Sequence, residues 1–391
     1  MIFQLIAERL ADLGRAGLMR RRLAREGPQG PRIVVGGREY LAFCSNDYLG
    51  LANHPRIVEA AVDAALRYGI GQGASHLLSG HTAAHERLES ALAEFVQMPR
   101  ALHFSSGYQA NIGAVTALAG PEDAVFSDAL NHASLIDGVR LSRAHVVRYP
   151  HADVDSLSKA LAASGGKIKL IVTDGVFSMD GDMAPVPALL DLCERHDALL
   201  LLDDAHGFGV VGAEGRGSVA HFGLSSPRIV YVGTLGKAAG VSGAFVAGAP
   251  EIVETILQRA RTYIYTTAAP AMLAAAVEAS LQLIRREEWR RERLRGLIAA
   301  LKESLREAEA GLTPSDTPIQ PLILGTNPRA MGASAALRER GLLVPAIRPP
   351  TVPEGTARLR ISLSAAHTEQ DISQLATALR EVCRSGTEAH A

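Results

Sequence analysis

The sequence has few cysteines, and the three that it has are far apart. Cys44, Cys193 and Cys383 form neither a CxxC pair nor the evenly numbered set of a disulfide framework. This usage argues against a small disulfide-stabilised secreted protein and against a cysteine-based metal site, and it is typical of a reducing compartment. We therefore expect a cytoplasmic protein.

Long apolar stretches and an excess of one charge are also missing. No window approaches the ~20 apolar residues of a membrane-spanning helix. The first 25 residues mix apolar side chains with acids and bases, unlike a signal or transit peptide. The 40 basic and 41 acidic residues leave a formal net charge of −1, so no long-range field attracts nucleic acid or anionic membrane. We expect neither as a partner.

From about residue 46 the sequence alternates short apolar runs with helical patterns. Runs such as Leu199–Leu202 and Ile229–Val232 are uniformly apolar, which favours strands buried on both faces of a mainly parallel sheet. Similar runs lie at residues 101–104, 170–173 and 244–247. The helical patterns between them supply crossovers, so the region is predicted to be an α/β domain. At 391 residues the chain is too long for one core.

The two ends of the chain are predicted to form smaller units. Residues 1–25 have the pattern of an amphipathic helix, and Gly36-Gly37 between two apolar runs predicts a two-residue hairpin. Residues 272–312 are predicted to be helical, broken near Gly296 at most, and residues 321–324, 342–347 and 358–362 are predicted to be strands. We therefore expect residues 1–45 to form an N-terminal helix and hairpin, 46–277 a large α/β domain, and 278–391 a linking helix with a small α+β domain.

Charged side chains follow two of the predicted buried strands. Lys237 lies on a glycine-flanked turn after residues 229–232, and Asp203 with His206 follows residues 199–202. In an open α/β sheet, ligands bind beyond the carboxyl ends of the strands. Alone, such a lysine is more often only solvated, and such an aspartate often caps a helix. A carboxylate on a buried strand nevertheless needs a partner, and a cationic pyridine nitrogen would be a natural one.

Other predicted strand ends carry weaker signals. The turn around Gly107 and Tyr108 opens a helix, whose free N–H groups can bind a phosphate. His132 follows a further apolar pair and could stack on a flat heteroaromatic ring, although a lone histidine is more often structural. Ser178 lies in a polar, glycine-rich turn at residues 175–182. None of these residues alone indicates a cofactor site, and only their combination does.

Four motifs together resemble the α-oxoamine synthases in order and spacing. They are Asn46–Leu51, Gly175–Asp182, Asp203–Gly207 and Thr234–Gly243. The resemblance covers essentially the whole chain. It implies a fold-type I enzyme that uses pyridoxal 5'-phosphate (PLP) to join an amino acid to an acyl thioester with loss of CO2. Members of this family are homodimers with the active site at the interface, and we expect the same here.

The resemblance also implies a role for each matched residue. Lys237 is expected to be the Schiff-base lysine and to move the substrate Cα proton. Asp203 is expected to pair with the pyridinium nitrogen, and His132 to stack on the ring. The other expected cofactor contacts are His206 at the phenolic oxygen, Ser178 beside the ring, and Gly107, Tyr108 and Thr234 at the phosphate.

Two positions depart from the family's pattern. Tyr108 stands where many members have Phe, a change expected to matter little. Residues 74–76, Ala-Ser-His, differ from the more usual Gly-Ser pattern of the loop at 69–80. The conformation of that loop is therefore left open.

The string at residues 346–361 looks like the 8-amino-7-oxononanoate synthases in particular. Their pimeloyl substrate ends in a free carboxylate, which a guanidinium can bind through two hydrogen bonds. Arg348 with Thr351, and Arg20 from the N-terminal helix, are the expected partners of that carboxylate. Arg360, with Asn46 nearby, resembles the group that binds the amino acid's α-carboxylate. The implied substrates are L-alanine and a pimeloyl thioester of coenzyme A or acyl carrier protein.

Several alternatives remain open. Succinyl-CoA also ends in a carboxylate, so a 5-aminolevulinate synthase type is the runner-up, and glycine C-acetyltransferases share the same core. The Arg-Pro-Pro-Thr string at 348–351 argues against the runner-up. An inactive scaffold would be expected to have lost Lys237 or Asp203, and a PLP-binding regulator would carry a DNA-binding appendage. A simple aminotransferase would transfer the amino group without releasing CO2 or thiol.

Overall fold

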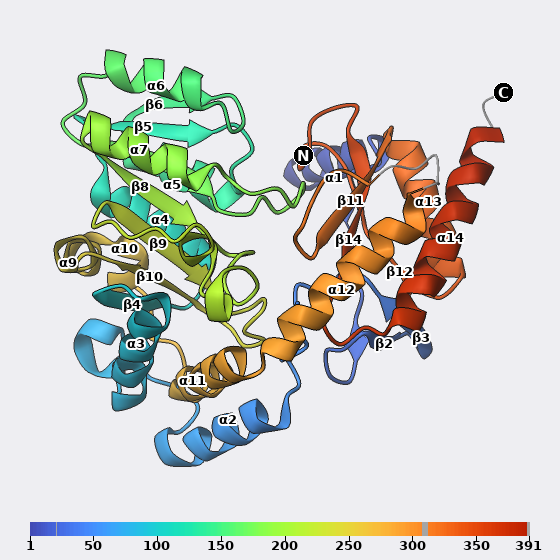
Figure 1. Cartoon of the computed structure of the whole chain (residues 1–391), viewed down its shortest axis with the longest axis horizontal. Coiled ribbons are helices and arrows are strands. Elements are labelled where there is room, and N and C mark those ends of the chain that lie inside the picture. The colour runs from blue at the N-terminus through green and yellow to red at the C-terminus, as the bar shows by residue number, and fades with distance from the viewer. Residues whose placement is uncertain (21, 307–311, 389–391) are drawn as a thin grey trace.

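A seven-stranded sheet forms the centre of the larger part of the molecule (Figure 1). The computed structural model describes residues 1–20, 22–306 and 312–388. The strand order is β4-β10-β9-β8-β7-β5-β6, in which β10 is antiparallel to both its neighbours and the other pairs are parallel. The strands are β4 (Arg100–Phe104), β5 (Ala124–Asp128), β6 (His145–Tyr149), β7 (Lys169–Asp174), β8 (Ala198–Asp203), β9 (Ile229–Thr234) and β10 (Ala244–Gly248).

Alternate residues of each central strand enter different cores. On β8, Leu201 packs into the core of one sheet face, whereas Leu200 and Leu202 pack into the core of the other. Because both faces are covered by helices, every strand position can be apolar, which confirms the mainly parallel α/β prediction. The strand β6 was not predicted, because this edge strand leaves residues such as Val146 exposed and so lacks a uniformly apolar run.

The two helical layers follow from this arrangement. The core of one face includes side chains of α4 (Gly107–Leu118), α5 (Ala133–Ser142), α9 (Pro250–Arg259) and α10 (Arg261–Ile264). The core of the other includes α3 (Ala83–Val96), α6 (Val154–Ala163), α7 (Val186–His196) and α11 (Ala271–Arg286), with α2 (Pro55–Tyr68) beside α11. Shorter turns are η1 (His76–Gly80), η2 (Ala213–Gly215) and α8 (Ser218–His221).

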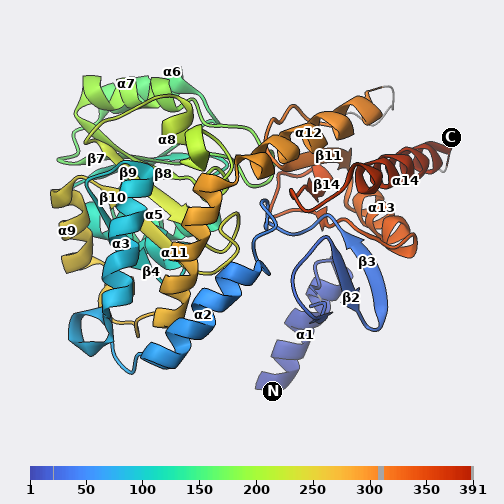
Figure 2. The same ribbon diagram turned by 60° about the horizontal axis from the view of Figure 1, so that its bottom comes forward.

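The smaller lobe combines both ends of the chain (Figure 2). Its antiparallel sheet β11-β14-β13 and its helices α12, α13 and α14 come from the C-terminal part, while β3 of the N-terminal hairpin pairs in parallel with β12. Gly36 and Gly37 have φ values of 59° and 73°, which suit the predicted two-residue turn. The elements are α1 (Ile2–Arg15), β1 (Arg25–Glu26), β2 (Arg32–Val35), β3 (Arg38–Ala42), α12 (Glu288–Leu305), β11 (Ile319–Gly325), α13 (Asn327–Glu339), β12 (Leu342–Leu343), β13 (Ala346–Ile347), β14 (Ala357–Ser362) and α14 (Glu369–Glu388).

Three details differ from the sequence-based expectations. The N-terminal helix ends at Arg15 rather than near residue 25. The long helix breaks at Glu287 (φ −103°, ψ 61°), and Gly296 lies inside α12; residues 307–311, also expected to be helical, lie outside the described residues. The segment predicted as one strand at 342–347 is two short strands in separate sheets, because Pro345 between them lacks an N–H group.

The division at residues 277/278 falls within α11 and remains a proposal. The helix α11 packs on α2 and α3 of the large domain, whereas α12 packs on α14 of the smaller lobe. Among the described residues, no helix is both long and apolar enough to cross a membrane.

Candidate functional site

A cavity of about 380 Å³ lies at the carboxyl ends of the parallel strands. Its lining includes eight of the residues singled out in the sequence, drawn from different strands and turns. These are Asn46, Gly107, Tyr108, His132, Asp203, His206, Lys237 and, at the end of β9, Thr234. The position agrees with the rule that open α/β sheets bind ligands beyond the carboxyl ends of their strands.

Lys237 reaches the cavity from the turn that joins β9 to β10. Backbone hydrogen bonds from Leu235 N to Gly243 O and from Val241 N to Leu235 O, both 2.9 Å, close this turn. Burial lowers the pKa of Lys237 below its ordinary value, while the nearby carboxylates of Asp203 and Asp174 act in the opposite direction. A lysine with a lowered pKa is more readily deprotonated, and its amine can then act as a nucleophile and as a base.

Asp203 is held in a fixed orientation at the end of β8. Its Oδ1 accepts a hydrogen bond from the Ala205 amide at 3.0 Å, and its Oδ2 accepts one from Asn111 Nδ2 at 2.6 Å. Asn111 Nδ2 also donates to Ser134 Oγ at 2.8 Å. The carboxyl group is buried, yet the residue lines the cavity, so it is placed to receive a cationic ligand group.

A second carboxyl group lies beside Asp203. Asp174 ends β7 and is paired with Asp203 in the register of the two strands. Burial raises the pKa of Asp174 well above its ordinary value, and the charge of Asp203 adds to that effect, although a hydrogen bond from the His132 amide opposes it. That bond joins His132 N to Asp174 Oδ2 at 2.7 Å and positions the histidine at the cavity wall.

His206 contacts Tyr48, which belongs to the motif Asn46–Leu51. Tyr48 OH lies 2.6 Å from His206 Nδ1 and donates to Asn46 Oδ1 at 3.1 Å. Burial lowers the pKa of His206 well below its ordinary value, and the cationic Lys237 and Arg360 lower it further. The imidazole is therefore neutral at physiological pH, so it can exchange a hydrogen bond without carrying charge.

The N-terminus of α4 forms a cradle at one end of the cavity. Ser106 caps the helix by accepting a hydrogen bond from Gln109 N at 3.3 Å, and the free N–H groups of the first turn lie at the cavity wall. A Cβ atom on Gly107 would lie 2.7 Å from Thr234 Cγ2, so only glycine allows this approach. The cradle suits a phosphate. The Tyr108 hydroxyl donates to Asp137.

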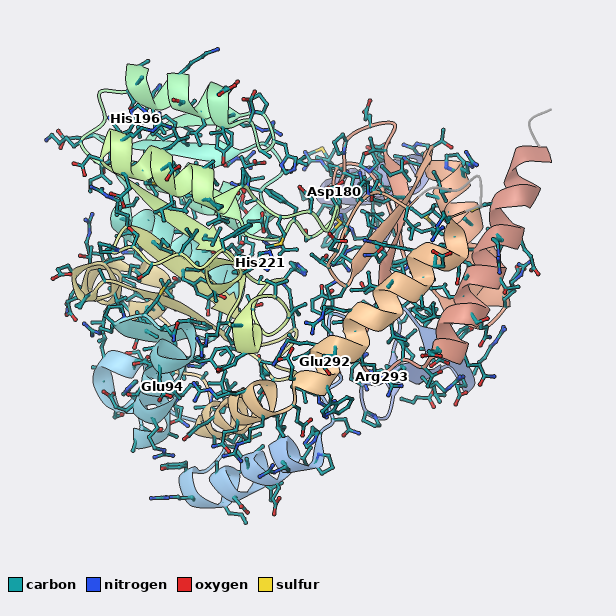
Figure 3. The ribbon with its side chains drawn as sticks, in the orientation of Figure 1. Glu94, Asp180, His196, His221, Glu292 and Arg293 are labelled. Atoms are coloured by element: carbon teal, nitrogen blue, oxygen red, sulfur yellow. The ribbon has the colours of Figure 1, made fainter. Side chains whose placement is uncertain are left out.

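Arg360 reaches this region from β14 of the smaller lobe. Its Nη1 donates to Asn46 Oδ1 at 3.2 Å and its Nε donates to Ser178 O at 2.6 Å. Beside it, Arg358 Nη1 lies 2.5 Å from Asp180 Oδ1, and Figure 3 shows Asp180 where the large domain faces the smaller lobe. Within the described residues, Ser178 is connected to the site through Arg360 and is not part of the cavity lining.

Arg348, Thr351 and Arg20 lie apart from this cavity. Arg348 donates a hydrogen bond to Gly17 O, three residues before Arg20, so the segment after β13 meets the segment after α1. Thr351 and Arg20 are exposed, and none of the three is among the described residues that line the cavity. A ligand group that they bind would therefore contact residues outside this cavity lining.

Four residues at the site carried no predicted role. Asp174 follows the apolar run 170–173 in the same way that Asp203 follows 199–202, so its position could have been found by the same signal. Asn111 lies one helical turn after Gly107, which places its side chain beside the strand ends. Tyr48 and Ser134 make contacts that depend on chain segments far apart in sequence, which no local pattern predicts.

His151 links the turn after β7, through Asp182, to the end of β5, through Asp128. Its Nδ1 lies 3.0 Å from Asp128 Oδ1 and its Nε2 lies 2.9 Å from Asp182 Oδ2. Hydrogen bonds to the two carboxylates raise its pKa from 6.5 to about 10. The protonated imidazole is thus favoured by folding, and its contribution to stability is complete below pH 6.5 and is lost as the pH rises through about 10.

We expect His151→Gln to lower the free energy of unfolding by about 1–2 kcal/mol at pH 6, because charge-assisted hydrogen bonds are lost from a partly exposed site. The difference from wild type should shrink as the pH approaches 10. Denaturant unfolding at pH 6, 8 and 10 measures it. The exposed His145→Gln is the control, because it removes a histidine without removing these two carboxylate contacts. A His151→Gln deficit that stays constant with pH would contradict the assignment.

Comparison with known proteins supports the interpretation of this cavity as an active site. Residues 38–379 match the model of the family described as aminotransferase class I and II. An 8-amino-7-oxononanoate synthase of Nitrosospira multiformis is 60% identical over 379 residues, which cover 97% of this chain and 96% of that protein. The solved structure of the Francisella tularensis 8-amino-7-oxononanoate synthase has a TM-score of 0.78 at 32% identity and covers 89% of this chain and 99% of its own. A serine palmitoyltransferase from S. paucimobilis, solved with bound PLP–myriocin aldimine, has a TM-score of 0.91 at 32% identity, covering 98% and 97% of the two chains.

Proposed function

The chain belongs to the class I and II aminotransferase family and is an α-oxoamine synthase of fold type I, and on that premise we propose that it catalyses the reaction for which its relatives are named. It is a PLP-dependent acyltransferase that condenses L-alanine with a pimeloyl thioester to give 8-amino-7-oxononanoate, CO2 and free thiol, a step of biotin biosynthesis. The observation that carries the proposal is the convergence of Lys237, Asp203 and the α4 cradle on one cavity. The choice of alanine and a pimeloyl thioester as substrates rests on the 60% sequence identity to an 8-amino-7-oxononanoate synthase.

The residues of the cavity fit PLP. The Gly107 cradle suits the phosphate, with Thr234 and the Tyr108 backbone beside it, and the buried Asp203 carboxylate suits the protonated ring nitrogen. His132 and His206 are proposed to contact the ring face and the phenolic oxygen. When bound, PLP supplies a ring that accepts electron density from the amino acid's Cα. Ser178 is proposed to act beside the ring through the Arg360 contact at its carbonyl oxygen.

The amino acid is bound by groups from both lobes. We assign its α-carboxylate to the Arg360 guanidinium, with Asn46, because Arg360 is buried and hydrogen-bonded to Asn46 and Ser178. We assign Lys237 as the proton carrier at Cα, since it lies in the cavity and burial lowers its pKa, which makes its amine easier to deprotonate.

The far end of the acyl chain is proposed to bind at Arg348, Thr351 and Arg20. The hydrogen bond from Arg348 to Gly17 O brings Arg348 to the segment that contains Arg20, and none of the three residues lines the Lys237 cavity. A pimeloyl group needs such a separation, because its free carboxylate is distant from the reacting thioester carbon. Arginine suits the role because its guanidinium can bind a carboxylate through two hydrogen bonds.

We expect Arg348→Ala to lower kcat/KM for pimeloyl-CoA by roughly 10- to 100-fold, because one charge-assisted contact to a non-reacting part of the substrate is lost. An uncharged acyl-CoA of similar length should be affected far less. Steady-state assays of CO2 and thiol release with the two thioesters measure this. Arg360→Ala should instead weaken alanine binding, and the exposed Arg329→Ala should change neither.

Two outcomes would contradict the assignment of substrates. If Arg348→Ala weakened both thioesters equally, the residue would be structural and the carboxylate would bind elsewhere. If wild type used glycine and succinyl-CoA better than alanine and pimeloyl-CoA, the 5-aminolevulinate synthase alternative would hold. Detection of the condensed product by mass, after incubation with alanine and pimeloyl-CoA, tests the reaction itself.

We further propose that the enzyme is a cytoplasmic homodimer with its active site at the interface. The widely spaced cysteines favour a reducing compartment. A second copy is favoured by α1, on which Phe3, Ile6 and Leu10 are exposed and no residue is buried. Sedimentation equilibrium of the PLP-loaded protein measures the mass, and a stable monomer with full activity would contradict the proposal.

A further inference from the structure

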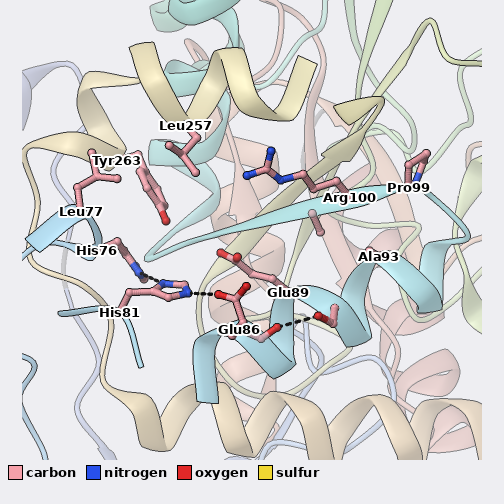
Figure 4. Close-up of a pocket in the computed structure, with 12 residues that line it drawn as sticks. His76, Leu77, His81, Glu86, Glu89, Ala93, Pro99, Arg100, Leu257 and Tyr263 are labelled. Atoms are coloured by element: carbon pink, nitrogen blue, oxygen red, sulfur yellow. Dashed lines mark hydrogen bonds and ion pairs between the residues drawn. The ribbon is translucent and has the colours of Figure 1, made fainter. Parts of the chain in front are cut away.

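A second pocket, of about 340 Å³, lies beside η1 and the first turns of α3 (Figure 4), and it shares no lining residue with the Lys237 cavity. It contains a cluster of imidazole and carboxylate groups to which the proposed reaction assigns no role. His81 Nε2 lies 2.7 Å from Glu86 Oε2. The ligand atoms of His81, Glu86 and Glu89 all lie within 4.8 Å of one another. The pocket lies on the loop that departs from the family's usual Gly-Ser pattern.

A neighbouring histidine determines which nitrogen of His81 can face this cluster. His76 Nδ1 lies 2.8 Å from His81 Nδ1, so one of these atoms carries the shared proton. When His81 donates that proton, its Nε2 presents a lone pair between the two carboxylates. Metal-bound histidines commonly have this arrangement, in which the second ring N–H donates to a neighbouring acceptor and holds the ring in place. His76 is itself buried and stacked on Tyr263, with ring centroids 4.9 Å apart.

Other charged groups near the pocket are already paired. His85 accepts a hydrogen bond from Thr82 N at Nδ1 (3.0 Å), so its Nε2 donates to Ala269 O at 2.8 Å. Neither nitrogen of His85 is then available to a metal. Arg100 also lines the pocket, but its guanidinium lies 2.5 Å from Glu254.

We propose that His81, Glu86 and Glu89 form a binding site for a divalent transition metal, with Zn²⁺ as the best match, and that His76 is a positioning residue. Zinc accepts one imidazole and two carboxylates at ~2.0–2.2 Å, which requires the three donor atoms to lie roughly 3–4 Å apart. The present separations, 2.7 Å between His81 Nε2 and Glu86 Oε2 and at most 4.8 Å within the whole set, are close to this requirement. The pocket is open to solvent at the exposed Glu86, so water can complete a tetrahedral shell.

The metal would join the loop to the helix that follows it. His81 lies just after η1, whereas Glu86 and Glu89 lie in the first two turns of α3. Both parts are tied to the segment after α10, the loop by a hydrogen bond from Ala268 N to Ala74 O (2.9 Å) and α3 by one from His85 to Ala269 O. Metal binding should therefore stabilise this part of the large domain, independently of the reaction at Lys237.

The test is zinc binding by the untagged, PLP-loaded full-length protein, titrated with zinc chloride against a chromophoric chelator. Wild type should bind one Zn²⁺ per chain at a site that saturates first. His81→Ala and Glu89→Gln should each weaken that site by at least ~100-fold, because a ligand is lost. His76→Ala should weaken it by ~10- to 100-fold, as for other groups that orient a ligand, and His76→Asn should recover part of the loss through its side-chain oxygen.

Matched controls separate this site from the chain's other histidines and acids. His145→Ala and Glu94→Gln, which change an exposed histidine and an exposed glutamate of α3, should bind zinc as wild type does. Zinc should raise the Tm of wild type and of both controls, but not that of His81→Ala. Glu86→Gln, whose side chain is 73% exposed, tests the same ligand set without disturbing folding. The proposal is overturned if wild type binds no more tightly than His81→Ala, or if the controls lose as much affinity as the ligand variants.

Discussion

Lys237→Ala should lose turnover of alanine and pimeloyl-CoA by at least ~10³-fold, because a positioned proton carrier contributes about 10²–10⁴ and the covalent link to the cofactor is lost as well. The side chain lies in the cavity on a turn closed by hydrogen bonds, and the lowered pKa of its amine follows first from burial. No other lysine is among the described residues that line this cavity.

Two measurements check the Lys237 prediction. Borohydride reduction of the PLP-loaded wild type, followed by peptide mapping, should find the cofactor attached to the peptide that contains Lys237. Turnover is then compared with that of Lys169→Ala, which removes a lysine at the opposite end of β7. This control should retain near-wild-type activity. Attachment of the cofactor at Lys169, or comparable turnover in the two variants, would show that the assignment is wrong.

Asp203→Asn should lower turnover by roughly 100-fold or more, corresponding to ~3 kcal/mol of lost electrostatic stabilisation. The neutral amide cannot hold the ring nitrogen in its protonated form, whereas the hydrogen bonds from Ala205 and Asn111 show how firmly the native carboxylate is oriented. Cofactor affinity should fall much less, because the α4 cradle and Lys237 are unchanged. Exchange of the alanine Cα proton in D2O, without thioester, should slow in parallel with turnover.

Asp174→Asn is the matched control for Asp203→Asn. Asp174 is the register partner of Asp203 on the neighbouring strand, and burial raises the pKa of its carboxyl group well above the ordinary value. A group that is largely protonated loses little charge on conversion to an amide, so this variant should remain within about tenfold of wild type. Equal losses in the two variants, or near-normal Cα exchange in Asp203→Asn, would mean that another group protonates the ring.

The central strands could be predicted because burial on both faces leaves a local signature. Leu199–Leu202 and Ile229–Val232 are uniformly apolar for that reason, and the polar residues that follow them mark the ligand edge of the sheet. The same rule identified Asp203 and Lys237. It did not identify β6, whose side chains face solvent at the sheet edge, or the break at Glu287, where the local sequence favours helix throughout.

The contacts around the site are long-range and leave no such signature. Tyr48 meets His206, and Arg360 meets Asn46 and Ser178, across separations of 158, 314 and 182 residues. The fold alone brings these partners together, because their meeting depends on how the smaller lobe packs against the large domain.

By itself, the sequence determined the α/β class, the strand ends that carry Lys237 and Asp203, and the family, since each depends on residues close together along the chain. Only the tertiary structure decided that Asn111 and the Ala205 amide orient Asp203, that Asp174 lies beside it, and that Arg348 meets the chain after α1. The physical reason is that the burial of a strand or helix is recorded in the apolar pattern of its own residues. Hydrogen-bond partners and pKa shifts depend instead on which distant segments the packed cores bring into contact.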